Sequence, residues 1–413
     1  MCKDIAYISF SGVWKDTPHI NISGSKSQTN RYVTLLAVTG SDVEIKNSSD
    51  SDDAASMRRV IDGAGINDVI DIGHAGTAMR FGTAYLSSRE GVDVVLTGSS
   101  RMCERPIRPL VDALRQLGAS IEYEGKEGYP PLRIKGGKIK GGECSISGEV
   151  SSQFISAIML SSPSFEKGVE INLIGKVVSV PYIKMTLEVL ADFGVKGIYQ
   201  DNKITIPATV ANVEREVVVE SDWSSASYYY SMVATSGREV SLSSFRHHSS
   251  QGDSHIVDIY RNLGVKTEWE GDMIRLLPID DFRKPERLDI DMENTPDVAQ
   301  SVAVTMAVLG IRGQITGLST LRVKETDRIA ALEAELSKFG VKCSSTQDTL
   351  SIDDFGDREK DILLNTYQDH RMAMAFVPMV LGGGFAVENP AVVSKSYTAF
   401  WEDMEKLGVE LKK

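Results

Sequence analysis

Short segments of small and polar residues lead into strongly apolar stretches at six places along the chain. These segments are SKSQTNRYVTLLAV, GHAGTAMRFGTAYL, SSQFISAIMLS, SDWSSASYYYSMVA, PDVAQSVAVTMAVLG and DHRMAMAFVPMVLG. Apolar runs of this length behind a polar, capping-type opening are typical of helices. The pattern therefore predicts six apolar helices, each with its amino end at a polar segment.

A second phrase recurs between these openings: an amphipathic helix ends in a glycine, and alternating apolar and polar residues follow. The glycines of the five clear copies are Gly118, Gly194, Gly264, Gly340 and Gly408. Glycine just past a helix is the usual carboxyl-terminal cap, and strict alternation indicates a strand. Self-similarity at a regular interval predicts one repeated helix–strand–helix–strand unit, present six times, and hence two domains of three units.

Composition narrows the class of protein. The chain has 413 residues, of which 42% are hydrophobic and 25% charged, as in ordinary globular proteins. A net charge of −12 disfavours non-specific nucleic-acid binding, so anionic ligands would need local clusters of Lys and Arg. The four cysteines show no metal-type spacing, and we find neither a signal peptide nor a membrane span in the sequence. We expect a cytoplasmic enzyme with no metal, no cofactor and no membrane or nucleic-acid partner.

The first opening, SGSKSQTNRY, combines Lys26, Ser27 and Arg31 at the start of a helix. It fits neither the nucleotide P-loop nor the dinucleotide glycine pattern. The free N–H groups and positive dipole end of a helix favour phosphate and carboxylate. The alternative is a solvated surface turn, so this segment alone does not establish an anion site.

Other openings carry similar chemistry. Small glycines in GHAGTAMR would let backbone amides approach a ligand, and the arginines of SRMCERPIRP suit carboxylate or phosphate. Lys324, Glu325 and Arg328 crowd into one turn of VKETDR, while His370 and Arg371 begin an apolar helix. Each of these segments also has an explanation that involves no ligand, namely helix capping, solvated charges or a structural histidine. Taken together they predict a cleft lined by cations from both halves, for two anionic substrates and proton transfer.

Seven segments in the same order resemble the family of 5-enolpyruvylshikimate-3-phosphate synthases. They are GSKSQTNR, GHAGTAMR, RMCERPI, SGEVSSQF, SDWSSASYY, VKETDRIAALEAEL and DHRMAMAF, and they span nearly the whole chain. The resemblance implies transfer of the enolpyruvyl group of phosphoenolpyruvate to the 5-hydroxyl of shikimate 3-phosphate, with release of phosphate. It also implies a monomer with small-molecule substrates only.

The same resemblance implies an α/β fold of two lobes, an inside-out α/β barrel built from six βαβαββ-type units, three per lobe. Residues 23–220 would form the N-terminal lobe, on the shikimate 3-phosphate side. Residues 1–22 and 221–413 would form the C-terminal lobe, with the phosphoenolpyruvate side and the acid/base residues. Between Asp53 and Gly73 the chain is shorter than many relatives, so we expect the first unit to lack a hairpin or strand pair.

The resemblance assigns site residues position by position. Those implied for shikimate 3-phosphate are Lys26, Ser27, Arg31, Ser151, Ser152, Gln153, Ser179, Tyr182, Asp297 and Lys324. Those implied for phosphoenolpyruvate are Lys26, Gly76, Arg105, Gln153, Arg328, Arg371 and Lys395. Those implied for catalysis are Asp297, Glu325, Lys26, His370 and Lys324.

Three positions depart from the family pattern. His74 stands where Asn is usual, Phe81 where Pro is common, and Thr320 where an Asn often contacts shikimate 3-phosphate.

Two alternatives remain open from the sequence. One is the sister transferase acting on UDP-N-acetylglucosamine, although its reactive cysteine usually lies farther before the Arg-Pro pair than Cys103 does here. The other is an inactive relative that binds anions without turnover.

Overall fold

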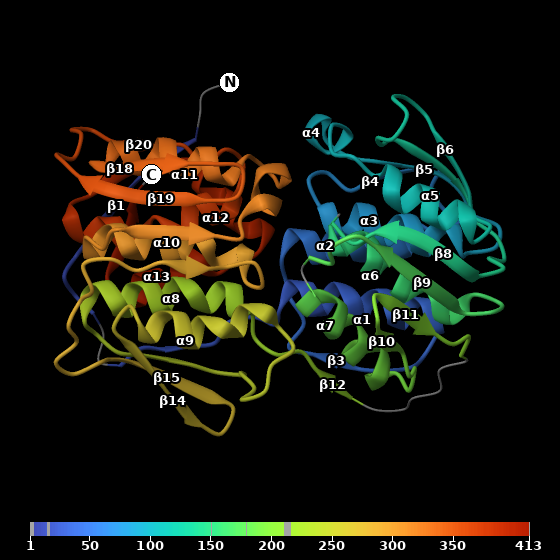
Figure 1. The fold of residues 1–413 in the computed structure, drawn as a ribbon, viewed down its shortest axis with the longest axis horizontal. Coiled ribbons are helices and arrows are strands. Elements are labelled where there is room, and N and C mark those ends of the chain that lie inside the picture. The colour runs from blue at the N-terminus through green and yellow to red at the C-terminus, as the bar shows by residue number, and fades with distance from the viewer. Residues whose placement is uncertain (1–3, 15–16, 150, 179, 210–215, 413) are drawn as a thin grey trace. The chain divides into compact units, whose positions relative to one another are not determined.

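The computed structural model describes residues 4–14, 17–149, 151–178, 180–209 and 216–412. Ser179, one of the predicted substrate residues, lies outside the described residues. The chain divides into two compact units (Figure 1). The N-terminal lobe is Gly24–Val219, and the C-terminal lobe is Met1–Ser23 with Glu220–Lys413.

The N-terminal lobe alternates helices with short strands. Its helices are α1 (Lys26–Thr39), α2 (Asp52–Gly63), α3 (Gly76–Ser87), α4 (Ser100–Cys103), α5 (Arg108–Gln116), α6 (Ser152–Ser161) and α7 (Val180–Asp192). Its strands are β3 (Ile45–Lys46), β4 (Val69–Asp71), β5 (Asp93–Thr97), β6 (Ser120–Tyr123), β7 (Leu132–Lys135), β8 (Gly142–Ser147), β9 (Val169–Ile174), β10 (Ile198–Gln200), β11 (Lys203–Ile206) and β12 (Val217–Val218).

The C-terminal lobe repeats this alternation. Its helices are α8 (Trp223–Ser236), α9 (Ile256–Arg261), α10 (Ala299–Leu309), α11 (Arg328–Lys338), α12 (His370–Ala375) and α13 (Phe400–Lys406). Its strands are β1 (Ile5–Phe10), β2 (His19–Ile20), β13 (Val240–Leu242), β14 (Val265–Glu270), β15 (Met273–Pro278), β16 (Ile290–Asp291), β17 (Gly313–Thr316), β18 (Val341–Ser345), β19 (Leu350–Phe355), β20 (Leu363–Leu364), β21 (Phe385–Glu388) and β22 (Val409–Lys412).

Each repeat forms its own small sheet, and five of the six described sheets have four strands in one order. In β4-β5-β7-β6, for example, β4 and β5 are parallel and are joined through the buried helix α3, while β6 and β7 are antiparallel. Two sheets of the C-terminal lobe each include a strand from the start of the chain. Strand β2 is an edge strand of one sheet, and β1 lies between β21 and β22 in another. The predicted α/β fold of six βαβαββ-type units is confirmed.

The first repeat is the shortened one. In the described residues its sheet has two strands, β12 and β3, which pair in parallel at Val217↔Ile45 and Val218↔Lys46. The chain passes from α2 directly to β4 of the next repeat, without the antiparallel pair found in the other repeats. The expected loss of a hairpin is therefore confirmed.

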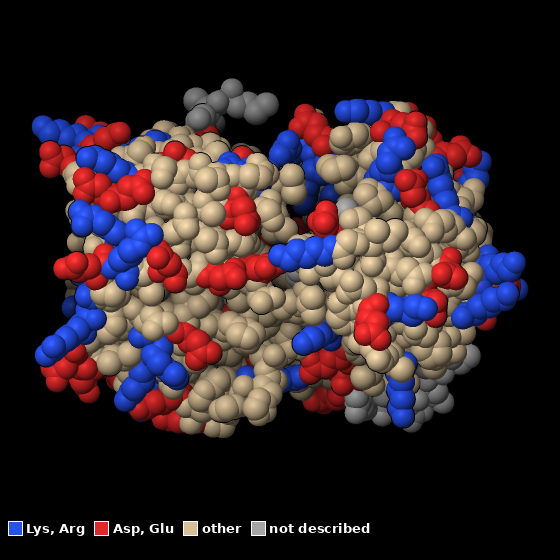
Figure 2. Space-filling view, viewed as in Figure 1, with Lys and Arg blue, Asp and Glu red and all other residues tan. Residues whose placement is uncertain are grey.

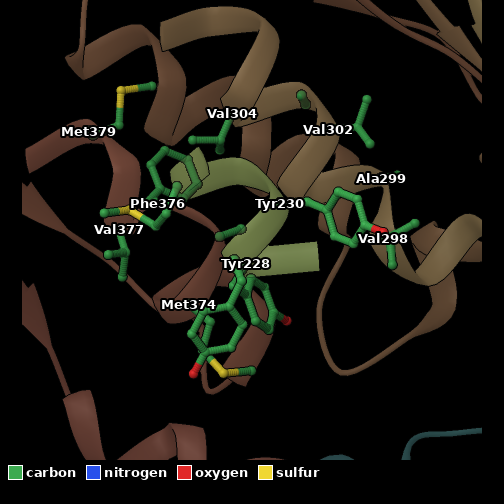
Figure 3. Packing of buried hydrophobic residues seen from close by; sticks show 14 of the residues in the cluster. Tyr228, Tyr230, Val298, Ala299, Val302, Val304, Met374, Phe376, Val377 and Met379 are labelled. Carbon is green, nitrogen blue, oxygen red and sulfur yellow. The ribbon is translucent and has the colours of Figure 1, made fainter. Parts of the chain in front are cut away.

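The first helix of each repeat lies inside its lobe. Every residue of α3 and of α12 is buried, and α1, α3 and α6 pack against one another, as α8, α10 and α12 do. Figure 3 shows this packing in the C-terminal lobe, where Tyr228, Val302 and Met374 of three different helices belong to one hydrophobic cluster. Burial of a large apolar side chain contributes about 1.5–3 kcal/mol. Helices inside and sheets outside are what the predicted inside-out organisation requires.

The recurring glycines follow the amphipathic helix in five of the six repeats. Gly118, Gly194, Gly264, Gly340 and Gly408 all have positive φ, between 76° and 106°. A residue with a side chain is disfavoured in this left-handed region, so glycine lets the chain reverse from helix to strand within one residue.

Glycine is also required at position 24, at the amino end of the N-terminal lobe, but here the reason is lack of space rather than backbone conformation. A Cβ on Gly24 would lie 1.8 Å from the carbonyl oxygen of Asn47 and 2.9 Å from Cγ1 of Val219. Asn47 in turn donates from Nδ2 to the Val219 carbonyl oxygen at 2.9 Å. Three separate segments therefore meet where only a hydrogen atom fits.

We predict that Gly24→Ala destabilises the protein by about 1–3 kcal/mol, because backbone atoms must move to admit the methyl group. Gly137→Ala is the matched control, since nothing lies within 4 Å of a Cβ at that position. Urea-unfolding midpoints of both variants measure the difference. Equal midpoints for the two variants would contradict the steric argument.

Candidate functional site

The predicted site residues gather at the amino ends of the buried helices. Lys26 begins α1, Gly76 begins α3, Ser152 begins α6 and His370 begins α12. Asp297 lies in the 3-10 turn η3 (Pro296–Val298), immediately before α10. Because backbone N–H groups at a helix start lack helical acceptors, these ends favour bound anions.

Lys26 is held by an ion pair. Its Nζ lies 3.3 Å from Oδ2 of Asp53, and the two side chains are only 14% and 12% exposed. Asp53 occupies the first turn of α2, where Ser51 is the amino-terminal cap. The pair therefore fixes a partly buried ammonium group at the amino end of α1.

Arg31 is the most enclosed cation of the N-terminal lobe. It donates from Nε to Oγ1 of Thr186 at 2.9 Å, from Nη1 to the Ser27 carbonyl oxygen at 2.8 Å, and from Nη2 to Oγ of Ser156 at 3.1 Å. Its guanidinium carbon also lies 5.7 Å from the centre of the Tyr182 ring. Burial lowers the pKa of Arg31 to about 10, so the group stays charged at neutral pH.

Two guanidinium groups approach Gly76. A Cβ at this position would lie 2.8 Å from Nη1 of Arg105 and 3.2 Å from Nη1 of Arg80. Arg80 is buried and donates from Nη1 to the Gly76 carbonyl oxygen at 3.1 Å. The glycine thus leaves the space beside Arg105 that a side chain would fill, and a planar guanidinium suits a carboxylate or phosphate.

The amino end of α6 adds neutral hydrogen-bonding groups. Ser151 caps the helix by accepting from the Gln153 N–H at 3.4 Å, and Ser152 is buried. Gln153 donates from Nε2 to Oγ1 of Thr77 at 3.2 Å, so the starts of α6 and α3 lie together.

In the C-terminal lobe the charges converge on Arg328. The guanidinium lies 2.7 Å from Oδ2 of Asp369, 2.8 Å from Oε2 of Glu325 and 3.1 Å from Oδ1 of Asp297. Its side chain is 2% exposed, and that of Asp369 is fully buried. Burial lowers the pKa of Arg328, but the carboxylates of Asp369 and Glu325 outweigh this and raise it above its usual value.

Asp297 is shared by three cations. Besides Arg328, Nζ of Lys324 lies 3.3 Å from its Oδ1, and Nη2 of Arg371 lies 3.5 Å from its Oδ2. The pKa of Arg371 stays well above its usual value, because Asp297 and the other nearby acids outweigh the effect of burial. The cluster therefore unites four of the predicted residues around one carboxylate.

A strained turn presents the start of α12. Tyr367 and Gln368 both have positive φ, at 54° and 56°, which is rare for residues with side chains. The Tyr367 hydroxyl donates to Oε1 of buried Glu335 at 2.7 Å, and Lys395 donates from Nζ to the Gln368 carbonyl oxygen at 2.6 Å. These contacts place Lys395 beside the turn that precedes Arg371.

His370 begins α12 in the interior of the C-terminal lobe. It is buried, and its Nδ1 lies 3.9 Å from Oδ1 of Asp369, which caps α12 by accepting from the Arg371 N–H at 2.9 Å. In each lobe, the predicted substrate and catalytic residues that the structure describes lie near one another, most of them at the starts of neighbouring helices. Lys26, Arg31, Gly76 and Gln153 lie in the N-terminal lobe, and Asp297, Lys324, Glu325, Arg328, His370, Arg371 and Lys395 in the C-terminal lobe.

Four residues that contact these groups were missed by the sequence analysis: Asp53, Ser224, Asp253 and Asp369. Asp369 and Asp53 had a signal, because an aspartate at a helix start is a usual cap or first-turn residue. Ser224 lies in the polar opening SDWSSASYYYSMVA but was not singled out there, and Asp253 had no local signal, since only folding brings the two residues beside Arg371.

Asp253 is a buried carboxyl group next to the Asp297 cluster. It lies in the 3-10 turn η2 (Gly252–His255) and accepts a hydrogen bond from the Ser224 hydroxyl. Burial raises the pKa of Asp253 to about 7, the charges of Asp297 and Asp222 add to the rise, and Arg371 opposes it.

This pKa predicts a particular pH dependence of stability. The ordinary value for Asp is 3.8, so between that pH and about 7 the folded state holds more protons than the unfolded chain. The free energy of unfolding must then fall as pH rises through this range. We predict a steeper fall for the wild type than for Asp253→Asn between about pH 4 and 7, measured by urea unfolding. Parallel pH profiles would contradict the assignment.

On the face shown in Figure 2, the Lys and Arg side chains of the described residues are interspersed with Asp and Glu over much of the surface. Among the described residues, no cluster of three or more His, Cys, Asp or Glu could hold a metal ion. In the same part of the chain, we find no helix with both the length and the apolar character to cross a membrane.

Comparison with known proteins identifies close relatives. A family model described as EPSP synthase (3-phosphoshikimate 1-carboxyvinyltransferase) matches residues 61–404. A Bacteroides fragilis protein named 3-phosphoshikimate 1-carboxyvinyltransferase is 42% identical over 398 residues, covering 95% of this chain and 96% of its own. A Haemophilus influenzae protein of the same name is 35% identical over 418 residues, with 94% and 96% covered.

Solved structures support the fold. The 2.37 Å structure of EPSP synthase from Acinetobacter baumannii superposes with a TM-score of 0.75 at 21% sequence identity. The match covers 99% of this chain and 100% of the other, so the whole chain has that fold.

Proposed function

Because the chain belongs to the EPSP synthase family, we propose that its two groups of cations and carboxylates bind shikimate 3-phosphate and phosphoenolpyruvate. The enzyme transfers the enolpyruvyl group of phosphoenolpyruvate to the 5-hydroxyl of shikimate 3-phosphate and releases phosphate, a step of the shikimate pathway. The observation that carries the proposal is the Asp297 carboxylate, held by Lys324, Arg328 and Arg371.

We assign shikimate 3-phosphate mainly to residues of the N-terminal lobe. The set is Lys26, Ser27, Arg31, Ser151, Ser152, Gln153, Ser179 and Tyr182, with Asp297 and Lys324 from the C-terminal lobe. Arg31 supports this assignment: a guanidinium has five N–H donors, and its three hydrogen bonds to described residues of the lobe leave two for a ligand. Neutral Ser and Gln side chains suit the hydroxyl groups of a sugar-like acid.

Phosphoenolpyruvate is assigned to Lys26, Gly76, Arg105, Gln153, Arg328, Arg371 and Lys395. The space at Gly76 beside Arg105 supports this, as does the approach of Arg371 to the Asp297 cluster. Arginine pairs with carboxylate and phosphate through two parallel hydrogen bonds, which matches a ligand that carries both groups.

The chemistry requires proton transfer in both directions. The 5-hydroxyl of shikimate 3-phosphate loses its proton as it attacks C2 of phosphoenolpyruvate, and C3 gains a proton. The resulting tetrahedral ketal then loses phosphate while C3 gives a proton back. We assign these transfers to Asp297 and Glu325, with Lys26, Lys324 and His370 beside them, because one acid/base pair can serve both steps in opposite senses.

The surrounding cations have a second role in this proposal. Two polyanionic substrates repel each other, and Lys and Arg reduce that repulsion while stabilising charge that develops in the transition state. The ion pairs around Asp297 hold these groups in place, so they need little reorganisation during the reaction.

The first test is phosphate release from phosphoenolpyruvate in the presence of shikimate 3-phosphate. Asp297→Asn should lower kcat by about 100- to 10,000-fold, because the variant cannot accept or deliver a proton. Asp327→Asn is the control: it caps α11 from a position outside the proposed set, and Asn is also a good cap.

Two outcomes would contradict the proposed reaction, and a third would contradict the role of Asp297. Release that depends on UDP-N-acetylglucosamine instead would move the enzyme to the sister transferase, and tight binding of shikimate 3-phosphate without any release would indicate an inactive relative. Near wild-type turnover by Asp297→Asn would remove Asp297 from proton transfer.

Arg31→Lys should raise the KM for shikimate 3-phosphate by about 10-fold or more, while the KM for phosphoenolpyruvate changes little. Lysine keeps the charge but cannot supply several donors in a fixed plane. Steady-state kinetics with each substrate varied in turn separates the two constants. A selective change in the phosphoenolpyruvate KM would reverse the assignment of Arg31.

The remaining proposals concern the state of the protein. We propose a cytoplasmic monomer that uses small-molecule substrates and no cofactor, as the resemblance implied. Size-exclusion chromatography with light scattering measures the oligomeric state.

A further inference from the structure

Arg371 is contacted on its guanidinium by two groups from different parts of the C-terminal lobe. Nη2 lies 3.5 Å from Oδ2 of Asp297 and donates to Oγ of Ser224 at 3.2 Å. Ser224 belongs to the first turn of α8, whereas Arg371 belongs to α12. The end of the arginine side chain is thus fixed by a group 147 residues away in sequence.

Arg371, Ser224 and Asp253 form a chain of hydrogen bonds in which each donor is determined by its chemistry. An arginine side chain can only donate, so the Ser224 oxygen must accept from Nη2. The serine hydroxyl has a single proton, and this proton is directed to Oδ2 of Asp253. With its proton directed to Asp253, the Ser224 hydroxyl has its oxygen lone pairs turned toward Arg371.

Asp253 is itself held in place. The neighbouring Gln251 donates from Nε2 to the Ser221 carbonyl oxygen at 2.8 Å and accepts from the Trp223 N–H at 3.1 Å. Gln251 also donates to Oε2 of buried Glu220 at 3.2 Å. The turn that carries Asp253 is thereby tied to the segment that leads into α8.

We propose that Ser224 and Asp253 are positioning residues for Arg371, and that they fix the orientation of its guanidinium toward phosphoenolpyruvate. The inference rests on the proposed role of Arg371 as a phosphoenolpyruvate ligand. Ser224 and Asp253 are 9% and 7% exposed and act through the arginine. A planar group must be aligned to form two parallel hydrogen bonds, so loss of its support weakens binding.

The test uses Ser224→Ala in the full-length enzyme. Loss of a hydrogen bond to a charged group corresponds to roughly a 10-fold loss of affinity or more. We expect the KM for phosphoenolpyruvate to rise by about this factor, with the KM for shikimate 3-phosphate within about 2-fold of wild type. Ser224→Thr keeps the hydroxyl and should restore most of the affinity. Asp253→Asn removes the charge and replaces one acceptor oxygen by an NH2 donor, but it keeps one oxygen that can accept from Ser224, so it should raise the same KM by a smaller factor.

Ser227→Ala is the matched control. Ser227 is buried on the same helix, and its hydroxyl contacts the Ser224 carbonyl oxygen and Oγ of Ser301. This variant should leave the KM for phosphoenolpyruvate unchanged. Melting temperatures of all variants separate a general loss of stability from a selective loss of affinity.

The outcomes are distinguishable. An unchanged phosphoenolpyruvate KM in both Ser224→Ala and Asp253→Asn, or equal changes for both substrates, overturns the positioning role. If Arg371→Lys also leaves this KM unchanged, the assignment of Arg371 fails as well. The proposed function itself would be overturned by a wild-type enzyme that releases no phosphate, or that releases it only with UDP-N-acetylglucosamine.

Discussion

The buried charge of Arg328 is the constraint on which the C-terminal lobe depends. Its three carboxylate partners come from η3, from its own turn and from the cap of α12, so one guanidinium links two repeats. Removing one partner from such a buried pair typically costs about 3–5 kcal/mol, because the other charge is left uncompensated. Asp297, once oriented by Arg328, in turn orients Lys324 and Arg371. Stability and the arrangement of functional groups therefore have the same physical origin.

The repeat explains why such groups occur at one end of each unit. In each repeat a buried helix begins where a parallel strand has just ended, and its first N–H groups need acceptors. Caps such as Asp369 and Ser151 satisfy some of these groups, and the others remain available to anions. The six repeats provide six such helix amino ends. Lys and Arg side chains at these ends, held in place by carboxylates, complete the binding groups for anions.

Much of the fold and some of the site could be predicted from the sequence, because these features depend on residues close together in the chain. The six apolar helices and the closing glycines follow from periodicity, and the glycines are required by positive φ, as at Gly340. The motif around Lys324 and Arg328 was visible as a dense group of charges. The contacts of Ser224 with Asp253, and of Arg328 with Asp369, join residues 29 and 41 positions apart, and no local pattern reports such contacts. The burial of His370 likewise depends on packing rather than on its neighbours in sequence.

Two of the three departures from the family pattern, His74 and Phe81, are accommodated by local contacts. His74 shares a hydrogen bond of 2.9 Å between its Nδ1 and Oγ of Ser99, the cap of α4, so the turn before Gly76 remains anchored. Phe81 is fully buried in α3, and its ring centre lies 5.5 Å from the guanidinium carbon of Arg31. A cation beside an aromatic face is stabilised by roughly 0.5–2 kcal/mol, more where water is excluded. In this enzyme the helix that starts at the proposed phosphoenolpyruvate glycine therefore also supports the proposed shikimate 3-phosphate arginine. A change at Phe81 should consequently affect both substrates, whereas a change at His74 should act through the Gly76 turn alone.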